Sequence, residues 1–400
     1  MPWGTNLVHP TPCDTYPGVD NTGLYLHIPF CAKKCRYCDF FSLAAPDRIF
    51  SFVKALLREI QLSGPLVPGM VDTVYIGGGT PSLLSAAQVD VVLSTVRDNF
   101  RLSTDAEITM EVNPDSATPA WLAAVRQAGV NRINIGIQSF DDARLAFLGR
   151  IHSARQAEDA LEASRRCGFD NIGADIIYAI PGQTRRDLEK DLDRTLSFSP
   201  DHISCYMLTC EPGTPLARAL ENREFDPLPD RQAADLFDTV SRYLTGRGYL
   251  HYEISNFATS PDTMARHNTK YWRRVPYVGL GPSAHSYTGT HRWWNHRDLD
   301  AYEKALQQGR PPRQEAETLT PAQQMLEAIY LGLRTADGIL MAAFEAEFGV
   351  DFCACFAQPL AQCRDQGLVV LSRGRCMPTR RGMRFHETVT ARFVGRIDLP

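Results

Sequence analysis

The sequence lacks an apolar run of about 18 residues, the length that a helix needs to span a bilayer. Its first twenty residues contain four prolines and no apolar core of the kind found in secretory signals. The chain also lacks an excess of positive charge, since its formal net charge is -4. These absences predict a cytoplasmic protein without a transmembrane segment, and they argue against a nucleic-acid partner.

Disulfide pairing is a further feature that the sequence does not favour. The chain has 11 cysteines, an odd number, and most of them are scattered over its 400 residues. Long chains with scattered cysteines are typical of reducing compartments. The exception is Cys31, Cys35 and Cys38, which fall within eight residues with the spacing C-x3-C-x2-C. We expect these three thiols to bind a metal centre.

Short β-type segments alternate with amphipathic helical segments over the first 255 residues. This alternation, repeated about six times, predicts an α/β fold with parallel strands joined by right-handed crossovers. A full barrel, a partial barrel and an open doubly wound sheet all fit the pattern. In each of them the functional groups are expected at the carboxyl ends of the strands. The predicted strands are residues 24–28, 73–76, 107–112, 132–137, 172–177 and 202–208.

Composition divides the chain into four predicted parts. A proline-rich tail covers residues 1–20, the α/β domain covers 21–255, an aromatic-rich connecting region covers 256–318, and a C-terminal domain covers 319–400. In the last part, helices are expected near residues 320–334, 339–348, 356–366 and 379–394, with a β-type segment at 368–371. Such a mostly helical unit with a small hairpin predicts a winged-helix-like domain.

Three thiolates on one loop suit either zinc or an iron–sulfur cluster, because both prefer soft sulfur ligands. A zinc site needs a fourth ligand, for which His27 and Asp39 are the nearby candidates. A four-iron cluster held by three thiolates leaves one iron open. An open metal position usually indicates chemistry rather than a purely structural role.

Glycines and polar residues follow several predicted strands. Residues 77–79 are three consecutive glycines, which allow a ligand to approach the backbone closely. Polar side chains at later strand ends or in the loops beyond them are Glu111, Gln138, Arg150 and Asp175. Each alone is explained by a turn, a loop or a satisfied core polar group, but together they predict the lining of a ligand site.

The cysteine spacing after the first strand of a βα barrel resembles the radical S-adenosylmethionine (SAM) superfamily. In that superfamily three thiolates hold a [4Fe-4S] cluster, and the amino and carboxylate groups of SAM chelate the open iron. An electron from the cluster then cleaves SAM to a 5′-deoxyadenosyl radical. Tyr37, directly before the last cysteine, fits the same pattern. The resemblance implies a partial (βα)6-type radical SAM barrel, a [4Fe-4S] cluster and SAM.

Longer strings resemble one family in this superfamily, that of the oxygen-independent coproporphyrinogen III oxidases and the haem chaperones HemW. The resemblance spans about residues 22–395 and rests on YLHIPFC (25–31), GGGTP (77–81), EVNP (111–114), GIQSF (136–140), DIIY (175–178) and YEISNF (252–257). The residues that it implies around the cluster-bound SAM are Tyr25, Gly79, Thr80 and Glu111. The residues that match a second SAM site of the oxidases are Tyr37, Gln138, Arg150 and Asp175.

Two positions separate the oxidases from the chaperones. The oxidases resemble C-x3-C-x2-C-x-C, whereas this chain has Phe40 at the place of the fourth cysteine. Residues 266–272, RHNTKYW, resemble the H-N-x-x-Y-W signature of the chaperones. By this resemblance His267 binds haem iron, and its aromatic neighbours border a porphyrin. The alternative is an aromatic-rich loop with a surface histidine.

The resemblance therefore implies a haem chaperone, which binds haem and a SAM-associated cluster and passes haem to apo-haemoproteins. Membrane respiratory enzymes are candidate recipients, which would require peripheral contact with a membrane. An electron donor for the cluster is also implied. The alternatives are radical-based oxidative decarboxylation of coproporphyrinogen III and radical chemistry on another tetrapyrrole.

Overall fold

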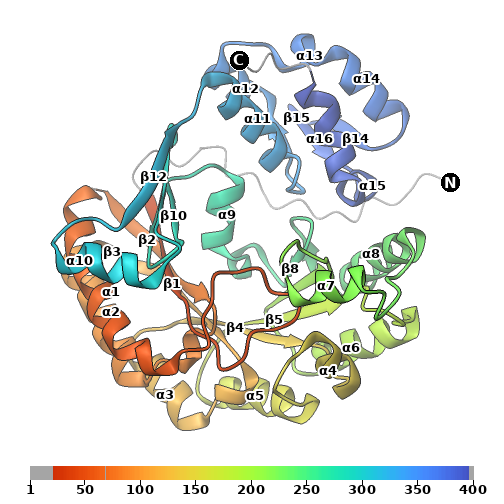
Figure 1. Cartoon of the computed structure of the whole chain (residues 1–400). Coiled ribbons are helices and arrows are strands. Elements are labelled where there is room, and N and C mark those ends of the chain that lie inside the picture. Colours follow the sequence, from red (N-terminus) through yellow and green to blue (C-terminus); the bar gives the residue numbers. More distant parts are fainter. Residues whose placement is uncertain (1–20, 68, 396–400) are drawn as a thin grey trace.

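The structure is a computed structural model that describes residues 21–67 and 69–395 (Figure 1). The predicted tail at residues 1–20 lies outside the described residues. Within the described part of the chain, no helix combines the length and the apolar character needed to cross a bilayer.

Six parallel strands form the centre of one 12-stranded sheet, in the order β12-β11-β10-β9-β1-β2-β3-β4-β5-β6-β8-β7. Each predicted strand is present, and the α/β prediction is confirmed. Figure 1 shows these strands curving into an arc, so the sheet is a partial barrel rather than an open flat sheet. These six strands are β1 (Asn21–Ile28), β2 (Met70–Gly78), β3 (Arg101–Val112), β4 (Arg132–Gln138), β5 (Asn171–Tyr178) and β6 (His202–Met207).

Helices cover the convex side of the arc (Figure 1). Their starts follow capping rules that the sequence displays, such as Thr118 accepting from Trp121 N ahead of α3, with Pro119 in the first turn. The helices of this part are α1 (Ile49–Ser63), α2 (Ala86–Asn99), α3 (Pro119–Gln127), α4 (Asp142–Leu148), α5 (Ala154–Arg166), α6 (Arg185–Ser197), α7 (Pro215–Glu221), α8 (Asp230–Thr245), α9 (Arg266–Trp272) and α10 (Leu299–Gln307).

The side-chain alternation of β1 shows how the sheet separates packing from function. Leu24, Leu26 and Ile28 have no exposed surface and belong to the main hydrophobic core, which they share with α1. Because successive side chains point to opposite faces of a strand, Tyr25 and His27 face the concave interior of the barrel. The hydrophobic residues therefore fix the helices outside, and the polar and aromatic ones line the interior.

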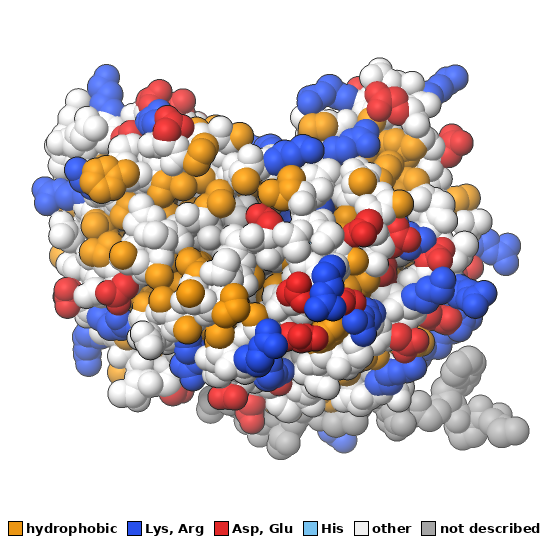
Figure 2. Space-filling model, turned by 90° about the horizontal axis from the view of Figure 1, so that it is seen from below, with side chains coloured by type: hydrophobic (Ala, Val, Ile, Leu, Met, Phe, Trp, Pro, Cys, Tyr) orange, Lys and Arg blue, Asp and Glu red, His pale blue; other side chains and the backbone are white. Residues whose placement is uncertain are grey.

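The outer face on the far side from the C-terminal domain carries mixed charge. Figure 2 shows Lys and Arg side chains interspersed there with Asp and Glu side chains and with apolar ones. Ion pairs on the outer helices include Arg194–Glu158 at 2.5 Å and Arg185–Glu189 at 2.7 Å. Exposed pairs of this kind contribute little to stability, about 0–1 kcal/mol each.

The connecting region predicted at 256–318 is part of the main sheet. After α9 the chain adds β9 parallel to β1, and the following strands extend the sheet as an antiparallel edge. The other strands of the sheet are β7 (Leu250–His251), β8 (Asn256–Ala258), β9 (Tyr277–Leu280), β10 (His285–Tyr287), β11 (His291–Asn295) and β12 (Arg313–Thr318). Residues 309–312 join α10 to β12.

A buried carboxyl group holds this extension against α1. Glu59 is 3 % exposed and accepts hydrogen bonds from Gly281 N at 2.7 Å, Asn295 Nδ2 at 2.6 Å and the Tyr302 hydroxyl at 2.6 Å. Burial raises the pKa of Glu59 to about 7, although the three donors favour the ionised form.

This raised pKa gives a testable pH dependence. The folded protein holds a proton on Glu59 that the unfolded chain has lost, so this group's contribution to stability falls as pH rises from about 4.5 to about 7. We expect the Glu59→Gln variant to lose this part of the slope, worth up to about 3 kcal/mol over that window. Urea unfolding of both proteins at several pH values measures it, and identical slopes would contradict the assignment. The pKa of Glu111 is also raised to about 7, but this residue is present in both proteins, so its contribution cancels from the difference in slope.

The C-terminal part has its own hydrophobic core, centred on Phe344, Phe352, Phe356 and Phe393. A three-stranded sheet of order β13-β15-β14 packs with the helices, as a winged-helix-like domain requires. The elements are α11 (Pro321–Gly332), β13 (Ile339–Leu340), α12 (Met341–Phe348), α13 (Phe352–Cys355), α14 (Ala357–Asp365), β14 (Val369–Ser372), β15 (Arg375–Pro378), α15 (Arg380–Arg384) and α16 (His386–Val394).

Two helices differ from the sequence-based prediction. The predicted helix 379–394 is broken at Phe385, whose φ of -110° and ψ of 33° interrupt the helical backbone between α15 and α16. The predicted helix 339–348 starts two residues late, because Ile339 and Leu340 pair with β15. In both cases packing inside the small domain overrides local helix preference.

Candidate cluster and cofactor site

The cysteine loop follows β1 directly and is anchored at both flanks. Cys31 N donates to Leu43 O at 3.0 Å, which closes the loop on itself. Arg36 N donates to Leu148 O at 3.1 Å, and Arg36 O accepts from Leu216 N at 2.8 Å. Backbone contacts with the segments at α4 and α7 therefore hold the three thiols at the carboxyl end of the barrel strands.

The glycine motif lies beside this loop. Gly79 N donates to Ile28 O at 2.8 Å, and Thr80 N donates to Phe30 O at 2.7 Å. A Cβ atom on Gly79 would lie 2.6 Å from Phe30 O, so a larger residue would push the two segments apart. Gly79 is a glycine because two backbone segments approach each other here, whereas Gly77 and Gly78 are approached closely by side chains. The Thr80 hydroxyl then donates to Cys31 Sγ at 3.5 Å.

Gly78 gives the sharpest test of this close approach. Its φ is +110°, and a Cβ atom there would lie 2.5 Å from Nδ1 of the buried His27 ring. Gly168 has a comparable φ of +84° with nothing within 4 Å of the added Cβ. We expect Gly168→Ala to cost about 1–2 kcal/mol of unfolding free energy, and Gly78→Ala to cost about 1–3 kcal/mol more. Equal losses in urea unfolding would show that the contact with His27 does not matter.

Glu111 closes the same end of the barrel from β3. Its carboxylate accepts from the Tyr75 hydroxyl at 2.7 Å and from Gly78 N at 3.2 Å. Burial raises the pKa of Glu111 to about 7. Tyr25, Gly79, Thr80 and Glu111 thus lie on the first three strands and the loops that follow them, and Thr80 contacts Cys31 directly.

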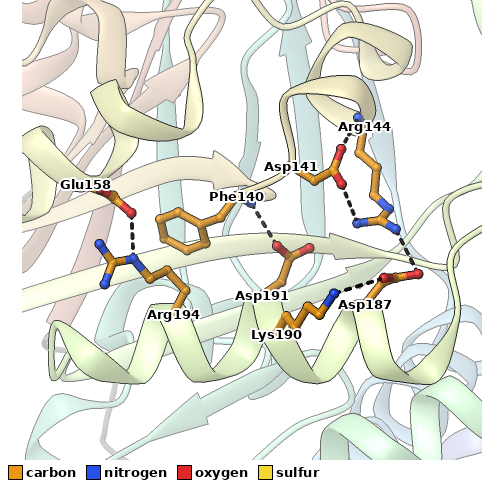
Figure 3. A pocket seen from close by; sticks show the side chains of 8 residues that line it. All are labelled: Phe140, Asp141, Arg144, Glu158, Asp187, Lys190, Asp191 and Arg194. Atoms are coloured by element: carbon orange, nitrogen blue, oxygen red, sulfur yellow. Dashed lines mark hydrogen bonds and ion pairs between the residues drawn. The ribbon is translucent and has the colours of Figure 1, made fainter.

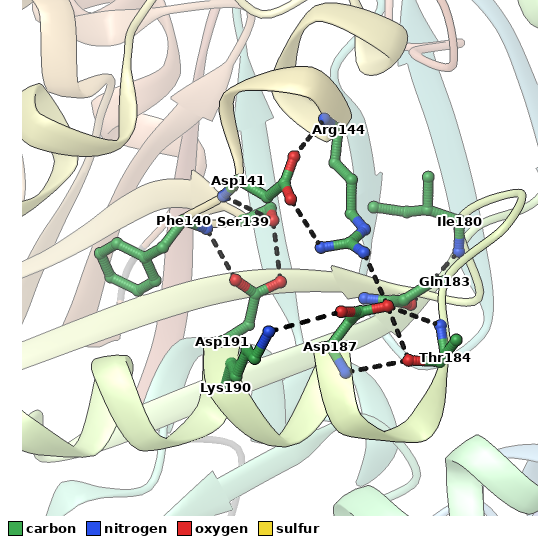
Figure 4. Close-up of polar contacts among 10 residues, drawn as sticks. All are labelled: Ser139, Phe140, Asp141, Arg144, Ile180, Gln183, Thr184, Asp187, Lys190 and Asp191. Atoms are coloured by element: carbon green, nitrogen blue, oxygen red, sulfur yellow. Dashed lines mark hydrogen bonds and ion pairs between the residues drawn. The ribbon is translucent and has the colours of Figure 1, made fainter.

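Gln138 ends β4 in a backbone conformation that few residues adopt. Its φ is +69°, in the left-handed region, and the register with β5 shifts at this point. Asp191 of α6, which is 3 % exposed, holds the following turn by accepting from Ser139 Oγ at 2.8 Å and Phe140 N at 2.9 Å (Figure 4). The buried carboxylate therefore stabilises the strained turn that presents Gln138.

The remaining candidates for a second SAM site lie around Arg150. Its guanidinium donates to Gly136 O at 2.9 Å and to Cys35 Sγ at 3.5 Å, and it lies near Tyr37. Asp175 of β5 pairs in register with Gly136 and accepts from Asn134 Nδ2 at 2.6 Å. Its Oδ1 atom is buried without a hydrogen-bond partner among the described residues. Such an orphaned acceptor in the barrel interior suits a polar ligand.

His267 lies at the other end of the barrel. It belongs to α9, which sits in the hollow of the arc (Figure 1), and its Nδ1 meets Thr73 Oγ1 near the start of β2 at 2.9 Å. The Tyr271 hydroxyl meets Nε2 at 2.8 Å, and the imidazole is 1 % exposed. Thr73 pairs with Gly23, five residues before the end of β1, or about 16 Å along the strand.

The residues present fit an iron–sulfur cluster better than zinc. Both His27 nitrogens are used, by the Tyr25 hydroxyl at 3.0 Å and Phe41 O at 2.8 Å, so His27 is not placed as a fourth zinc ligand. Among the described residues, no three His, Cys, Asp or Glu side chains converge to hold a single ion. Hydrogen-bond donors point at the sulfurs of Cys31 and Cys35, as thiolate ligands require.

A groove of about 330 Å³ on the outer face, between the turn after β4, α5 and α6, is separate from this site (Figure 3). Its charged side chains are bound to one another: Arg144 pairs with Asp141 at 3.1 Å and Asp187 at 2.9 Å, and Arg194 pairs with Glu158. These pairs hold α4, α5 and α6 together and satisfy the charges internally. We therefore assign this groove a structural role.

Comparison with known proteins agrees with this geometry. Residues 25–195 match the radical SAM superfamily, and residues 319–385 match the HemN C-terminal domain. A protein of Mycobacterium tuberculosis named "Heme chaperone HemW" is 35% identical over 363 residues, which cover 89% of this chain and 92% of that protein. The protein of the same name from Bacillus subtilis is 31% identical over 379 residues, covering 93% and 99%.

Among solved structures, coproporphyrinogen III oxidase (HemN) from Escherichia coli, described as a radical SAM enzyme, matches with a TM-score of 0.81 and 25% identity. The match covers 94% of this chain and 90% of the oxidase chain. The predicted radical SAM barrel with a C-terminal domain is therefore confirmed. Membership of the radical SAM superfamily implies a [4Fe-4S] cluster and SAM. The extent of the identity to both HemW proteins shows that this chain belongs to the HemW family of the radical SAM superfamily.

Proposed function

We propose that this protein is a haem chaperone: it binds haem, holds a SAM-associated [4Fe-4S] cluster, and passes haem to apo-haemoproteins. The names of its relatives support the haem part, and the superfamily supports the cluster and SAM. Phe40 also supports it, because this position has no thiol and its side chain is 60 % exposed. Membrane respiratory enzymes, reached by peripheral contact with a membrane, are the recipients that we propose.

The observation that carries the haem proposal is the environment of His267. The ring lies 5.3 Å from Tyr75, 6.4 Å from Tyr25 and 5.2 Å from Tyr271, measured between ring centroids. Burial lowers the pKa of His267 to about 3, so the imidazole is neutral at physiological pH, which is the form that binds iron.

Haem binding at His267 requires a local rearrangement. Iron reaches Nε2 only after the Tyr271 hydroxyl has left it, and α9 must expose a ring that is 1 % exposed. Loss of the Tyr271 hydrogen bond costs about 0.5–1.5 kcal/mol, and movement of α9 also breaks the hydrogen bonds from Arg266 N and His267 N to Glu107. The proposal therefore includes movement of α9 away from the start of β2.

At the other end of the barrel, Cys31, Cys35 and Cys38 would hold the cluster. Tyr25, Gly79, Thr80 and Glu111 would contact the SAM bound to it. When bound, the cluster supplies a single electron for SAM cleavage. The residues of this chain position the thiolates and donate to the sulfurs. A soluble low-potential electron donor would be the redox partner of the cluster.

One observation favours a second candidate function, oxidative decarboxylation of a tetrapyrrole propionate. Tyr37, Gln138, Arg150 and Asp175, which match the second SAM site of the oxidases, are brought together around Gly136. Phe40 argues against this candidate, since it replaces the additional cysteine. A second SAM site without decarboxylase activity is compatible with the chaperone proposal.

One preparation tests both functions. The protein is purified and reconstituted anaerobically, titrated with haem, and then assayed with coproporphyrinogen III, SAM and a reductant. We expect stoichiometric haem binding, haem transfer to an apo-cytochrome and no protoporphyrinogen. Turnover in the decarboxylase assay would overturn the chaperone-only proposal.

A further inference from the structure

We propose that Asn113 is a positioning residue for the cluster: it holds the two donors that act on the sulfurs of Cys31 and Cys35, and so raises the cluster's reduction potential. The inference rests on the cluster assignment of the proposed function and not on haem binding. Asn113 follows β3 and lies between the glycine motif and Arg150.

One arm of this arrangement runs to Cys31. Asn113 Nδ2 donates to Thr80 Oγ1 at 3.2 Å, and the Thr80 hydroxyl donates to Cys31 Sγ at 3.5 Å. Because the hydroxyl oxygen accepts from the amide, its single hydrogen is left for the sulfur. Thr80 is 4 % exposed, so water does not compete freely for that hydrogen.

The other arm runs to Cys35. Asn113 Oδ1 accepts from Arg150 Nη2 at 2.9 Å, and Arg150 Nη1 donates to Cys35 Sγ at 3.5 Å. Arg150 Nη2 also donates to Gly136 O at 2.9 Å, which fixes the plane of the guanidinium. A single amide therefore joins the two donors across the site.

The donor and the acceptor of every hydrogen bond in this network are determined. The guanidinium can only donate, so the oxygen of Asn113 faces it and the amide nitrogen faces Thr80. Both ends of the chain consequently present donors to sulfur. Two donors at fixed positions suit two acceptors, that is, the thiolates of Cys31 and Cys35 in their metal-bound form.

The backbone around Asn113 is held by other residues. Asn113 N donates to Ser82 Oγ at 3.0 Å, and Asn113 O accepts from Ser116 Oγ at 3.0 Å. The two serine hydroxyls are 2.6 Å apart. Because these contacts do not involve the amide side chain, that side chain can be changed while the turn keeps its support.

Hydrogen bonds to ligand sulfurs make a cluster easier to reduce. The added electron increases the negative charge on the sulfurs, and the donors from Thr80 and Arg150 stabilise that charge more in the reduced state. Asn113 itself touches neither sulfur, so its effect is transmitted through the two donors that it orients.

The test is the reduction potential of the anaerobically reconstituted cluster without SAM, with the EPR spectrum of the reduced state recorded in parallel. We expect Asn113→Leu, which has a similar size and no polar group, to keep its iron and sulfide. Its equilibrium constant for one-electron reduction should fall about tenfold, which corresponds to a potential lowered by about 59 mV.

Two further variants make the result specific. Ser116→Ala removes a contact to the same turn without a path to sulfur, and its potential should equal that of the wild type. Thr80→Val removes the donor to Cys31 and should lower the potential. In the Thr80→Val background, Asn113→Leu should lower the potential by less than it does alone, because only its effect through Arg150 and Cys35 remains.

The outcomes separate the inference from the function on which it rests. If the wild type assembles no cluster, the cluster assignment fails. If the cluster assembles and Asn113→Leu does not shift the potential relative to Ser116→Ala, the inference is wrong. If Asn113→Leu does not fold, Thr80→Val alone decides: an unshifted potential there also overturns it.

Discussion

Anaerobically reconstituted Cys35→Ala protein is expected to contain almost no iron or sulfide and to lack the broad visible absorbance of a cluster. The reason is that only three thiols follow β1, so removing one leaves two ligands and an uncompensated Arg150 guanidinium 3.5 Å from the lost sulfur. Iron and sulfide analysis together with the absorbance spectrum measures the loss.

The control must lose a thiol without losing a ligand. Cys355 is an exposed, free cysteine in the C-terminal domain, so Cys355→Ala should retain the full iron and sulfide content. Thermal unfolding of both apoproteins checks that folding is unaffected. Iron and sulfide retained by Cys35→Ala at the wild-type level would overturn the cluster assignment and everything that rests on it.

Haem binding should be almost lost in His267→Ala. The variant removes the imidazole proposed to bind iron, and it also removes buried contacts to Thr73 and Tyr271, which should cost about 2–4 kcal/mol of unfolding free energy. Haem titration followed at the Soret band measures affinity. Circular dichroism at the temperature of the titration shows whether the variant is folded when it is compared with the wild type.

The variant Tyr271→Phe is expected to increase haem affinity, which is the opposite of the loss expected for His267→Ala. A gain in affinity cannot result from misfolding. The variant removes the hydroxyl that occupies Nε2 and keeps the aromatic ring, so haem affinity should rise about two- to tenfold. His285→Ala, which removes an exposed imidazole stacked on Trp294, should leave affinity unchanged. Unchanged haem binding in His267→Ala would remove the ligand assignment and leave the cluster assignment intact.

Most of the barrel was predictable because its signals are local. The alternation of β1 between apolar and interior-facing residues, and the caps of α3 and α5, are set by neighbours a few residues apart. The residues missed at the site are those whose role depends on distant partners. Asn113 stood in the EVNP string, and Asp191 looked like an ordinary helical carboxylate of α6.

The predicted location of His267 shows the same limit. The resemblance identified the residue, but the expectation that functional groups gather at the carboxyl ends of the strands does not describe it. His267 lies about 16 Å farther down β1, level with Gly23, because α9 folds back into the hollow of the sheet. This placement is visible only in the tertiary structure, where the chain that leaves β8 turns back into the hollow as α9.

The sequence by itself determined the α/β class, the loop with three closely spaced thiols and the glycine turn. These features follow from periodicity and from spacings within a few residues, which the backbone converts directly into structure. The tertiary structure decided how the 256–318 region extends the sheet, why α15 and α16 are separate, and which amide joins Thr80 to Arg150. Those features depend on contacts between segments far apart in the chain, whose energies no local pattern records.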